Sequence, residues 1–455
     1  MPKLELNYKE LPPCDVLVAG GGSAGVAAAV SAGRAGAKTI LIEKSTFLGG
    51  MATGALVTPM MKNALDARNI LTKGVFLEVC NRLVKAGGGA TFQDGNPGWF
   101  NPEVYKWVLD EMCLEAKVKL MFENQIVAVE MLHATSLLKR IFFVNKGGFF
   151  SIAAKEFIDC TGDGDLIALS GTCHESGEKN HRQAMSLRFM MSGVDLRVLA
   201  KWLKENDKKG DSPVHFLDNG DILLSSAYTF EKEWTLKPFF DDALKNKELE
   251  KEDAAYFQIF SVPASQGLVA FNCPRITPES KTLDPLNNED TSWILTHGRQ
   301  MIKKISNFCK KYLPGFSHSY VCQIAPNIGV RESRRLIGQY VLSADDVLSG
   351  KKFEDAIADS NWPIDIHPSR IGEKGQLRHP PKNDYYQIPL RSLLPKENEI
   401  KNLIVAGRCL SASFEAQGSA RIQANCWAMG EAAGILAAKR IQNSDLSKDT
   451  KAERR

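Results

Sequence analysis

Three glycines near the start of the sequence, Gly20, Gly22 and Gly25, have the spacing of a loop that binds a pyrophosphate. In a G-x-G-x-x-G turn the first glycine permits a tight bend, the second lets the backbone approach the phosphates, and the third lets a helix pack closely on a strand. Ser23 and Ala24 lie within the turn, where the first amides of a helix and its positive dipole end attract an anion. The glycines therefore predict a nucleotide site.

The elements on either side of the turn support this prediction. Residues 15–20 (DVLVAG) form an apolar run typical of a buried parallel strand, and the alanine-rich residues 23–36 predict the helix that follows. Residues 38–44 (KTILIEK) predict a second strand that ends in Glu43 and Lys44. A carboxylate about 20 residues after the last glycine accepts hydrogen bonds from the hydroxyls of an adenosine ribose and repels a 2′-phosphate. Although glycine turns also occur for packing alone, the complete unit predicts FAD or NAD.

A second glycine pair, Gly49 and Gly50, favours FAD over NAD. With the following Met51, Ala52 and Thr53, it resembles the Gly-Gly loop that flavoproteins of the glutathione-reductase and fumarate-reductase type place beside the flavin. Small residues let the backbone lie against a wide planar ring without obstruction by side chains. The alternative is that these are ordinary turn glycines.

Helical and then strand-like patterns follow the glycine pair. Residues 69–89 and 101–116 predict two amphipathic helices, the second with Asn101 as N-cap and Pro102 in its first turn. The pattern then changes to short strand-like runs at residues 118–124, 125–132, 139–145 and 149–159. These runs predict a three-strand meander.

The end of the meander, EFIDCTGDGD, resembles the segment of the same flavoproteins in which a strand ending in Thr-Gly-Asp returns to the cofactor domain. Thr161, Gly162 and Asp163 match that motif. The resemblance also assigns Ile126 and Val127, in one of the meander strands, to the FAD site.

The C-terminal part carries the most specific resemblance. Residues 402–407 (NLIVAG) predict a strand, and the small residues that follow predict a helix from near Gly418 to about Lys439. The stretches NLIVAGRCLSAS, GSARIQ, MGEAAG and, upstream, IGVRESRRLIGQYVLSADDVL are similar to a bacterial FAD-dependent oxidoreductase family, distantly related to fumarate reductase and the tRNA-modifying flavoprotein MnmG. The resemblance implies that FAD lies along Gly407, Arg408, Gly418, Ser419, Arg421 and Ile422. Residues 418–422 are expected to supply the helix N-terminus that stabilises negative charge on the reduced flavin.

Together these elements predict an α/β fold. A Rossmann-like FAD-binding domain with a parallel central sheet and a three-strand β-meander is expected from residues 1–176 and 384–455. Residues 177–383 mix helix-like and strand-like runs with charged loops, which predicts an inserted α+β domain that covers the substrate.

The catalytic groups are marked less clearly. Candidates for acid–base work are His181, His297, Arg331 and Glu332, although a lone histidine in a loop is more often structural. The family that the chain resembles often carries histidine at the position of Phe414, so this chain needs another residue there or acts on another substrate.

The segment GVRESRR, Gly329 to Arg335, allows two interpretations. In a helix, Arg331, Arg334 and Arg335 would share one face and repel one another, unless carboxylates or a ligand lie opposite. One alternative is a buried network of ion pairs. The other is a clamp for an anionic substrate, with Arg331, or less favourably Arg334, beside the isoalloxazine, because the guanidinium fork matches a carboxylate.

Composition and charge exclude other classes of partner. The net charge of +4 arises from 57 basic and 53 acidic residues without a basic stripe, and no apolar run of about 18 residues occurs, so we expect no nucleic-acid and no membrane partner. The polar N-terminus lacks the apolar core of a signal peptide, and the ten cysteines include no C-x-x-C pair, which favours a cytoplasmic location. The histidines show no H-x-x-x-H pair, and we expect no metal. The sequence leaves the oligomeric state open.

We therefore predict an FAD-dependent oxidoreductase that transfers a hydride between a small organic, anionic substrate and non-covalently bound FAD. Some fumarate-reductase relatives attach FAD through a histidine in the loop after the ribose acid, but the first histidine here is His133, far beyond that loop. Two alternatives remain: an RNA-modifying flavoprotein of the MnmG type, which the near-neutral charge opposes, and a non-catalytic binder like the Rab GDP-dissociation inhibitors, which the Gly-Gly loop opposes. Flavin hydroxylases usually show Gly-Asp before the C-terminal helix, where this chain has GRC. We therefore rank oxygen insertion below dehydrogenation or reduction as the reaction type.

Overall fold

The main sheet of the molecule is built around the N-terminal strand β1. The structure is a computed structural model that describes residues 5–132, 136–178 and 181–452. The strands follow the order β5-β2-β1-β8-β7-β6, with β23 also paired to β8. Pairing is parallel among β5, β2, β1, β8 and β23 and antiparallel from β8 through β7 to β6. The strands span β1 (Lys9–Ala19), β2 (Thr39–Ile42), β5 (Lys119–Met121), β6 (Gln125–Leu132), β7 (Leu137–Asn145), β8 (Gly148–Asp159) and β23 (Leu403–Val405).

Burial explains why these residues form a parallel sheet. Every residue of β2 is buried, as are the last four of β1, which pair in register from Val16 opposite Thr39 to Ala19 opposite Ile42. A strand covered on both faces carries such a continuous apolar run. The predicted α/β fold with a parallel sheet and a three-strand meander is confirmed. The first predicted strand of that region differs, because β5 joins the parallel part of the sheet and the meander consists of β6, β7 and β8.

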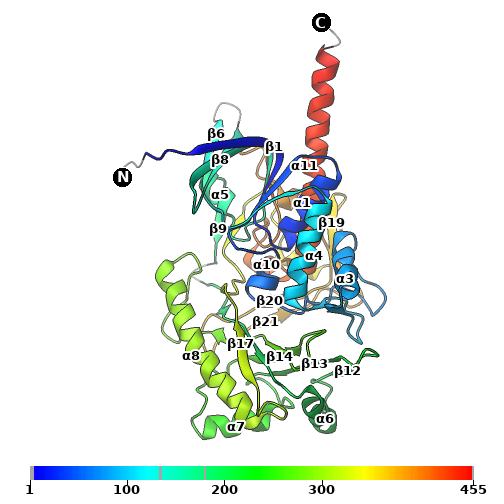
Figure 1. Cartoon of the computed structure of the whole chain (residues 1–455), viewed down its shortest axis with the longest axis vertical. Coiled ribbons are helices and arrows are strands. Elements are labelled where there is room, and N and C mark those ends of the chain that lie inside the picture. The colour runs from blue at the N-terminus through cyan, green and yellow to red at the C-terminus, as the bar shows by residue number, and fades with distance from the viewer. Residues whose placement is uncertain (1–4, 133–135, 179–180, 453–455) are drawn as a thin grey trace.

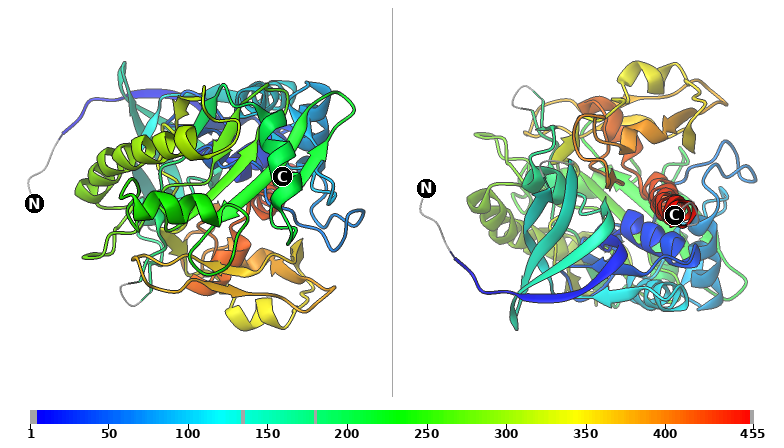
Figure 2. Two further views of the ribbon diagram at one scale, coloured as in Figure 1. Left: turned by 90° about the horizontal axis from the view of Figure 1, so that it is seen from below. Right: turned by 90° about the horizontal axis from the view of Figure 1, so that it is seen from above.

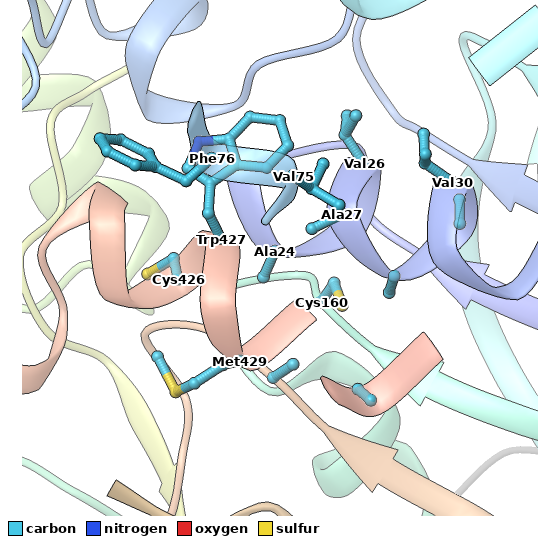
Figure 3. Close-up of a cluster of buried hydrophobic side chains, with 14 of the residues drawn as sticks. Ala24, Val26, Ala27, Val30, Val75, Phe76, Cys160, Cys426, Trp427 and Met429 are labelled. Carbon is cyan, nitrogen blue, oxygen red and sulfur yellow. The ribbon is translucent and has the colours of Figure 1, made fainter. Parts of the chain in front are cut away.

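Two helices with small residues cover one face of the sheet. Helix α1 (Ser23–Arg34) packs against α11 (Gln423–Ala452), and Figure 3 shows Trp427 of α11 beside Ala24 and Ala27 of α1. A Cβ atom at Gly430 would lie 2.1 Å from the carbonyl oxygen of Ala24. The two backbones therefore touch at a distance that only glycine permits.

Helices α2 (Met51–Gly54), α3 (Val75–Lys85) and α4 (Pro102–Glu115) complete the cofactor lobe. Asn101 caps α4 as predicted, since its side chain accepts a hydrogen bond of 2.9 Å from the amide of Glu103. Helix α5 (Asp165–Ser170) follows the end of β8. None of the helices in the described residues combines the length and hydrophobicity that a membrane span requires.

A second sheet forms the opposite half of the molecule (Figure 1). Its strands are antiparallel in the order β12-β13-β14-β15-β11-β17 and pack on α6 (Leu196–Asn206), α7 (Lys237–Lys245) and α8 (Asn288–Tyr312) around a separate apolar core. The strands span β11 (Phe189–Ser192), β12 (Val214–Phe216), β13 (Ile222–Tyr228), β14 (Phe257–Ser261), β15 (Val269–Phe271) and β17 (Tyr320–Ile324).

The segment between this sheet and β23 packs on the cofactor lobe. Leu342, Val347, Ala358 and Ile364 belong to the same apolar core as α1 and α11. Figure 2 shows the segment, yellow to orange, along one side of the molecule next to α10 (Phe414–Ala420). Its elements are β18 (Arg334–Leu336), α9 (Ala344–Leu348), β19 (Ala356–Ser360), β20 (Ile364–Ile366), β21 (Gln376–Arg378), β22 (Tyr386–Pro389) and the 3₁₀ turn η1 (Leu390–Leu393). The boundaries of the inserted domain, residues 177 and 383, stay a prediction.

Five short strands join the lobes or lie at their edges. They are β3 (Gly89–Ala90), β4 (Trp99–Phe100), β9 (His174–Ser176), β10 (Met185–Ser186) and β16 (Arg275–Ile276), of which β10 pairs with β16 and β9 with β18.

Candidate functional site

The two glycine loops lie against each other at the carboxyl ends of β1 and β2. Gly22 and Gly49 form a parallel bridge, and the amide of Gly49 donates a hydrogen bond of 2.8 Å to the carbonyl of Gly21. Gly50 has φ +52°, and a Cβ atom there would lie 2.8 Å from the Cα atom of Gly22. The loops therefore meet backbone to backbone, with no room for side chains between them.

The N-terminus of α1 fits a pyrophosphate. Its N-cap is Gly22, no side chain caps it, and its first turn contains no acidic residue, so the first amides stay available to an anion. Gly25 has the packing role expected from the sequence, because a Cβ atom there would lie 1.8 Å from the carbonyl oxygen of Gly20. Ser23 and Ala24 form the buried start of this helix.

A cavity of about 40 Å³ adjoins the first loop. Glu43 is 7% exposed; its Oε2 accepts a hydrogen bond of 2.6 Å from the amide of Gly21 and its Oε1 one of 2.8 Å from the amide of Ser45. A carboxylate has about four acceptor positions, so these bonds leave capacity for a ribose hydroxyl. Val127, predicted beside FAD, is 39% exposed and lies outside the lining. The lining is formed by Gly20, Ile42, Glu43, Lys44, Asn124, Gln125, Ile126, Thr161 and Asp165.

The Thr-Gly-Asp motif connects this cavity to the C-terminal motif. Asp163 Oδ1 accepts a hydrogen bond of 2.6 Å from Arg408 Nη2 and one of 2.7 Å from Ser333 Oγ. Burial opposes the charge of Asp163, but Arg408 and Lys44 hold its pKa below the usual value. Gly162, with φ +75°, leaves 3.1 Å between its Cβ position and the Arg408 guanidinium. Three segments far apart in the sequence are thus tied together at one point.

A larger cavity of about 360 Å³ lies between the two lobes. Both lobes contribute to it, and the residues predicted to lie beside the flavin, Met51, Gly418, Arg421 and Ile422, form part of its wall. The other lining residues are Val57, Pro59, Met61, Ser186, Arg188, Tyr256, Gln258, Asn272, Gly329, Val330, Arg331, Trp362, Asp365, His367, Arg408 and Gln423.

Arginines dominate the charge of this larger cavity. Arg188, Arg331 and Arg421 line it, and the Arg275 guanidinium lies 4.1 Å from the ring centre of the lining Tyr256. None of the four forms an ion pair with a carboxylate in the described ranges of the chain. Burial lowers the pKa of Arg188 and of Arg421 to about 10, and burial together with the neighbouring arginines lowers that of Arg331 well below its usual value. The cavity therefore suits an anion.

Arg331 has the geometry of a half-satisfied fork. Its Nη1 donates to the carbonyl of Ala184 at 2.6 Å and to Ser186 Oγ at 2.9 Å. Its Nε and Nη2 atoms have no hydrogen-bond partner among the residues with described positions. One edge of the guanidinium is thus held in place, and the other is free for a planar anion.

Asp365 and His367 form the acidic and basic pair of the cavity. His367 Nε2 lies 3.2 Å from Asp365 Oδ2. Burial and the charges of Arg275 and Arg331 lower the pKa of His367 well below its usual value. Burial opposes the charge of Asp365, but His367 and the arginines lower its pKa as well. At neutral pH the pair therefore consists of a neutral imidazole and a carboxylate. The sequence analysis missed both residues, for which the only signal was the short spacing D-x-H.

The two histidines predicted to be catalytic lie away from the larger cavity. His297, on α8, places its Nε2 3.0 Å from Glu252 Oε2 and stacks on Trp293 with 4.3 Å between ring centres. His181 is exposed and bonds through its backbone to Glu178. Neither lines the cavity.

The GVRESRR segment is not a helix: Gly329 forms an isolated bridge with Ser186, and Arg334 and Arg335 begin β18. Arg331 faces the larger cavity, whereas Arg335 pairs with Glu332 at 2.6 Å and with Glu175 at 3.0 Å, and Arg334 pairs with Asp165 at 3.1 Å. The interpretation as ion pairs therefore holds for Arg334 and Arg335, and the clamp at Arg331 stays a prediction. A single arginine faces the cavity, and the other two belong to ion pairs.

The helix predicted from Gly418 to Lys439 is also corrected. Gly418 and Ser419 belong to α10, the helix is interrupted at Arg421 and Ile422, and α11 begins at Gln423. The helix N-terminus at the cavity is therefore that of α11. Ser419 is buried, with its hydroxyl 2.7 Å from Tyr386 Oη and 2.6 Å from the carbonyl of Trp362. Gly407 has φ +97°, and its Cβ position is 3.1 Å from Ala24.

Phe414 is 5% exposed, and the Arg335 guanidinium lies 5.7 Å from its ring centre, so this position holds no titratable group. His133 lies outside the described residues. Within the described ranges no group of three or more histidine, cysteine and acidic side chains could hold a metal ion.

Comparisons with known proteins agree with a flavoprotein fold. A family model described as FAD dependent oxidoreductase matches residues 15–452. No curated protein matches the chain. Solved structures similar to it include a geranylgeranyl bacteriochlorophyll reductase-like protein from Thermoplasma acidophilum, at 14% identity and TM-score 0.47 over 96% of this chain and 80% of that one. Others are a flavoprotein/dehydrogenase from Cytophaga hutchinsonii (13%, TM-score 0.44, 95% and 79%) and p-nitrophenol 4-monooxygenase from Pseudomonas putida DLL-E4 (12%, TM-score 0.41, 72% and 70%). These similarities are too distant to bear on the reaction.

Proposed function

Because the chain belongs to the FAD dependent oxidoreductase family, we propose that it transfers a hydride between FAD and a small organic anion bound in the larger cavity. The FAD supplies the two-electron chemistry, since its ring accepts or donates a hydride. The observation that carries the proposal is the set of four arginines around this cavity, two buried and two partly buried, that lack a carboxylate partner within the described residues.

In this proposal the FAD extends from the smaller cavity to the larger one. Glu43 and Lys44 would hold the adenosine, and the N-terminus of α1 the pyrophosphate. The flavin would lie between the loop of residues 49–53 and the break between α10 and α11. Met51 and Ile422 line the larger cavity from these two segments, so the flavin would adjoin it.

Charge balance favours an anionic substrate. Two unit charges about 8 Å apart repel by roughly 2 kcal/mol at an effective dielectric constant of about 20, so a group of four is costly without counter-ions. Asp365 is the one acidic side chain in the lining that the structure describes. A substrate carboxylate or phosphate would relieve the remaining repulsion, and the free edge of Arg331 would orient it.

The test uses sodium malonate as a probe of the purified, FAD-loaded protein. Malonate should perturb the flavin absorbance in a saturable way. Arg331→Met removes a charge-assisted hydrogen bond and should raise the Kd roughly tenfold or more. Arg331→Lys keeps the charge but loses the planar fork, so its Kd for malonate should lie between those of the wild type and Arg331→Met. Arg299→Met, at an exposed site on α8, is the matched control and should bind like the wild type.

Two results would contradict the proposal. One is a flavin spectrum that malonate, succinate and sulfate all leave unchanged. The other is malonate binding that is equally tight in wild type and Arg331→Met.

A further inference from the structure

We infer that His367 is the catalytic residue that accepts the substrate proton, with Asp365 as its positioning partner. The inference rests on the proposed function, because it assigns a role within the same cavity. It depends on where the two side chains lie, which of the two ring nitrogens is engaged, and which charges surround the ring.

The fold fixes the position of this pair. Asp365 lies in β20 and His367 directly follows it; β20 pairs with β21 from Ile364 opposite Arg378 to Ile366 opposite Gln376. Arg421 Nη2 donates a hydrogen bond of 3.0 Å to the carbonyl of Asp365. β20 also packs on α10, where a Cβ atom at Gly418 would lie 3.1 Å from that carbonyl oxygen. The strand is thus attached to the segment expected beside the flavin.

The contact with Asp365 determines which nitrogen of His367 can act. Nε2 is the ring nitrogen that faces Asp365 Oδ2, at 3.2 Å, so the carboxylate favours the neutral tautomer that carries its proton on Nε2. Nδ1 then has a free lone pair, and it has no hydrogen-bond partner among the described residues. Since the side chain lines the larger cavity, Nδ1 is the nitrogen available to a bound molecule.

Groups from several elements set the charge state of the ring. Asp365 faces it from β20, Arg275 from β16 and Arg331 from the segment of residues 329–335, while Arg421, at the break before α11, acts on Asp365. Tyr256 lies edge-on, with 6.5 Å between ring centres. Without a substrate the arginines oppose protonation of the ring. A bound anion offsets their charge, so the ring becomes a better base when substrate is present.

The reaction then balances as follows. In the oxidative direction the substrate loses two electrons and two hydrogens. One hydrogen would leave carbon with both C–H electrons as a hydride, for which FAD would supply the acceptor. The other leaves the adjacent oxygen or nitrogen as a proton that binds Nδ1 of His367, and a double bond forms between the carbon and that atom. The imidazolium lies between Asp365 and the anionic substrate, and it returns the proton when the reaction runs in reverse.

Proton uptake on ligand binding tests the inference without turnover. Malonate is titrated into the FAD-loaded protein at pH 6.0 in two buffers of different ionisation enthalpy, and calorimetry gives the number of protons bound. The wild type should take up about half a proton or more per malonate. His367→Gln keeps a donor near Asp365 but lacks Nδ1 and should take up none, and His367→Asn provides a second variant if the first does not fold. His297→Gln removes a histidine that also pairs with a carboxylate and should behave like the wild type.

Each outcome decides the matter. Uptake that is absent in the wild type, or unchanged in both His367 variants, overturns the inference even if malonate binds, and leaves the proposed function standing. Loss of uptake in His297→Gln alone assigns the role to His297 and also overturns it. If malonate, succinate and sulfate all fail to bind, the proposed function fails and the inference fails with it. If one of them binds, ¹⁵N NMR of the ligand-free, histidine-labelled protein at pH 7 gives a second readout. A neutral His367 with its proton on Nε2 supports the inference, whereas a charged ring or a proton on Nδ1 refutes it.

Discussion

Replacement of Glu43 should weaken both the fold and FAD binding, because its carboxylate has two roles. Its two oxygens accept hydrogen bonds of 2.6 and 2.8 Å from the amides of Gly21 and Ser45, and its side chain faces the smaller cavity. A hydrogen bond to a charged group contributes about 1.5–3 kcal/mol. Glu43→Ala removes both bonds and should lower the free energy of unfolding of the apo-protein by about 3–5 kcal/mol. Loss of a ribose contact should also raise the Kd for FAD roughly tenfold or more.

Glu43→Gln separates these contributions. A glutamine offers one carbonyl oxygen, so it keeps one of the two amide contacts and places its NH₂ group against the other. We expect it to cost about half as much stability as Glu43→Ala. The assays are urea unfolding of the apo-protein and titration of FAD by quenching of flavin fluorescence. Glu123→Gln, at an exposed site on the same edge of the sheet, is the control.

The two measurements refute different parts of the reasoning. An unchanged Kd for FAD in Glu43→Ala would show that the carboxylate only shapes the loop. Unchanged apo-protein stability would show that the amide contacts do not matter. Equal losses of unfolding free energy in Glu43→Ala and Glu43→Gln would contradict the assumption that each carboxylate oxygen contributes one separate hydrogen bond.

Three further predictions follow from the same structure. Acid precipitation should release all yellow colour into the supernatant, since we predict non-covalent FAD, and colour in the pellet would disprove this. Gly430→Ala should lower stability by about 1–3 kcal/mol, because the new methyl group would lie 2.1 Å from the Ala24 carbonyl; thermal unfolding beside Ile435→Ala, 39% exposed on the same helix, checks this. Burial raises the pKa of Glu156 to about 7, although Arg440 opposes the shift. A carboxyl whose pKa is raised by folding binds its proton more tightly in the folded state, so stability falls as pH rises from about 4.5 through 7. Glu156→Gln should therefore gain up to about 3 kcal/mol relative to wild type between pH 4.5 and 8 in urea unfolding, and a constant difference would contradict the shift.

The nucleotide-binding half was predictable because its signals are local. The G-x-G-x-x-G turn, the apolar runs of β1 and β2 and the cap at Asn101 each depend on residues within one or two turns of each other. Such features keep their meaning wherever the rest of the chain lies. The same holds for the alternation that predicted the meander.

The catalytic cavity was predicted less well because long-range contacts assemble it. Asp365 lies in a strand of three residues and His367 directly follows it. The strand has no recognisable periodicity, and its packing on α10 brings it to the cavity. The end of α10 was also missed, since the run of small residues predicted one continuous helix from Gly418 to Lys439. The physical cause is a long-range cap: the Arg421 guanidinium bonds both the carbonyl of Gly418 and that of Asp365, which ends the helix there.

The contact between α1 and α11 has a consequence for how the protein is made. Hundreds of residues separate these helices in the chain, yet the backbone of Ala24, at the phosphate-binding turn, touches Gly430. During synthesis the phosphate-binding turn therefore leaves the ribosome long before α11, the helix that packs against it. Until α11 emerges, α1 presents an uncovered face of alanine and valine to the cell, and the nascent chain has no completed site for its nucleotide. We therefore expect FAD to bind after synthesis is complete and to stabilise the contact between the N-terminal and C-terminal parts of the chain.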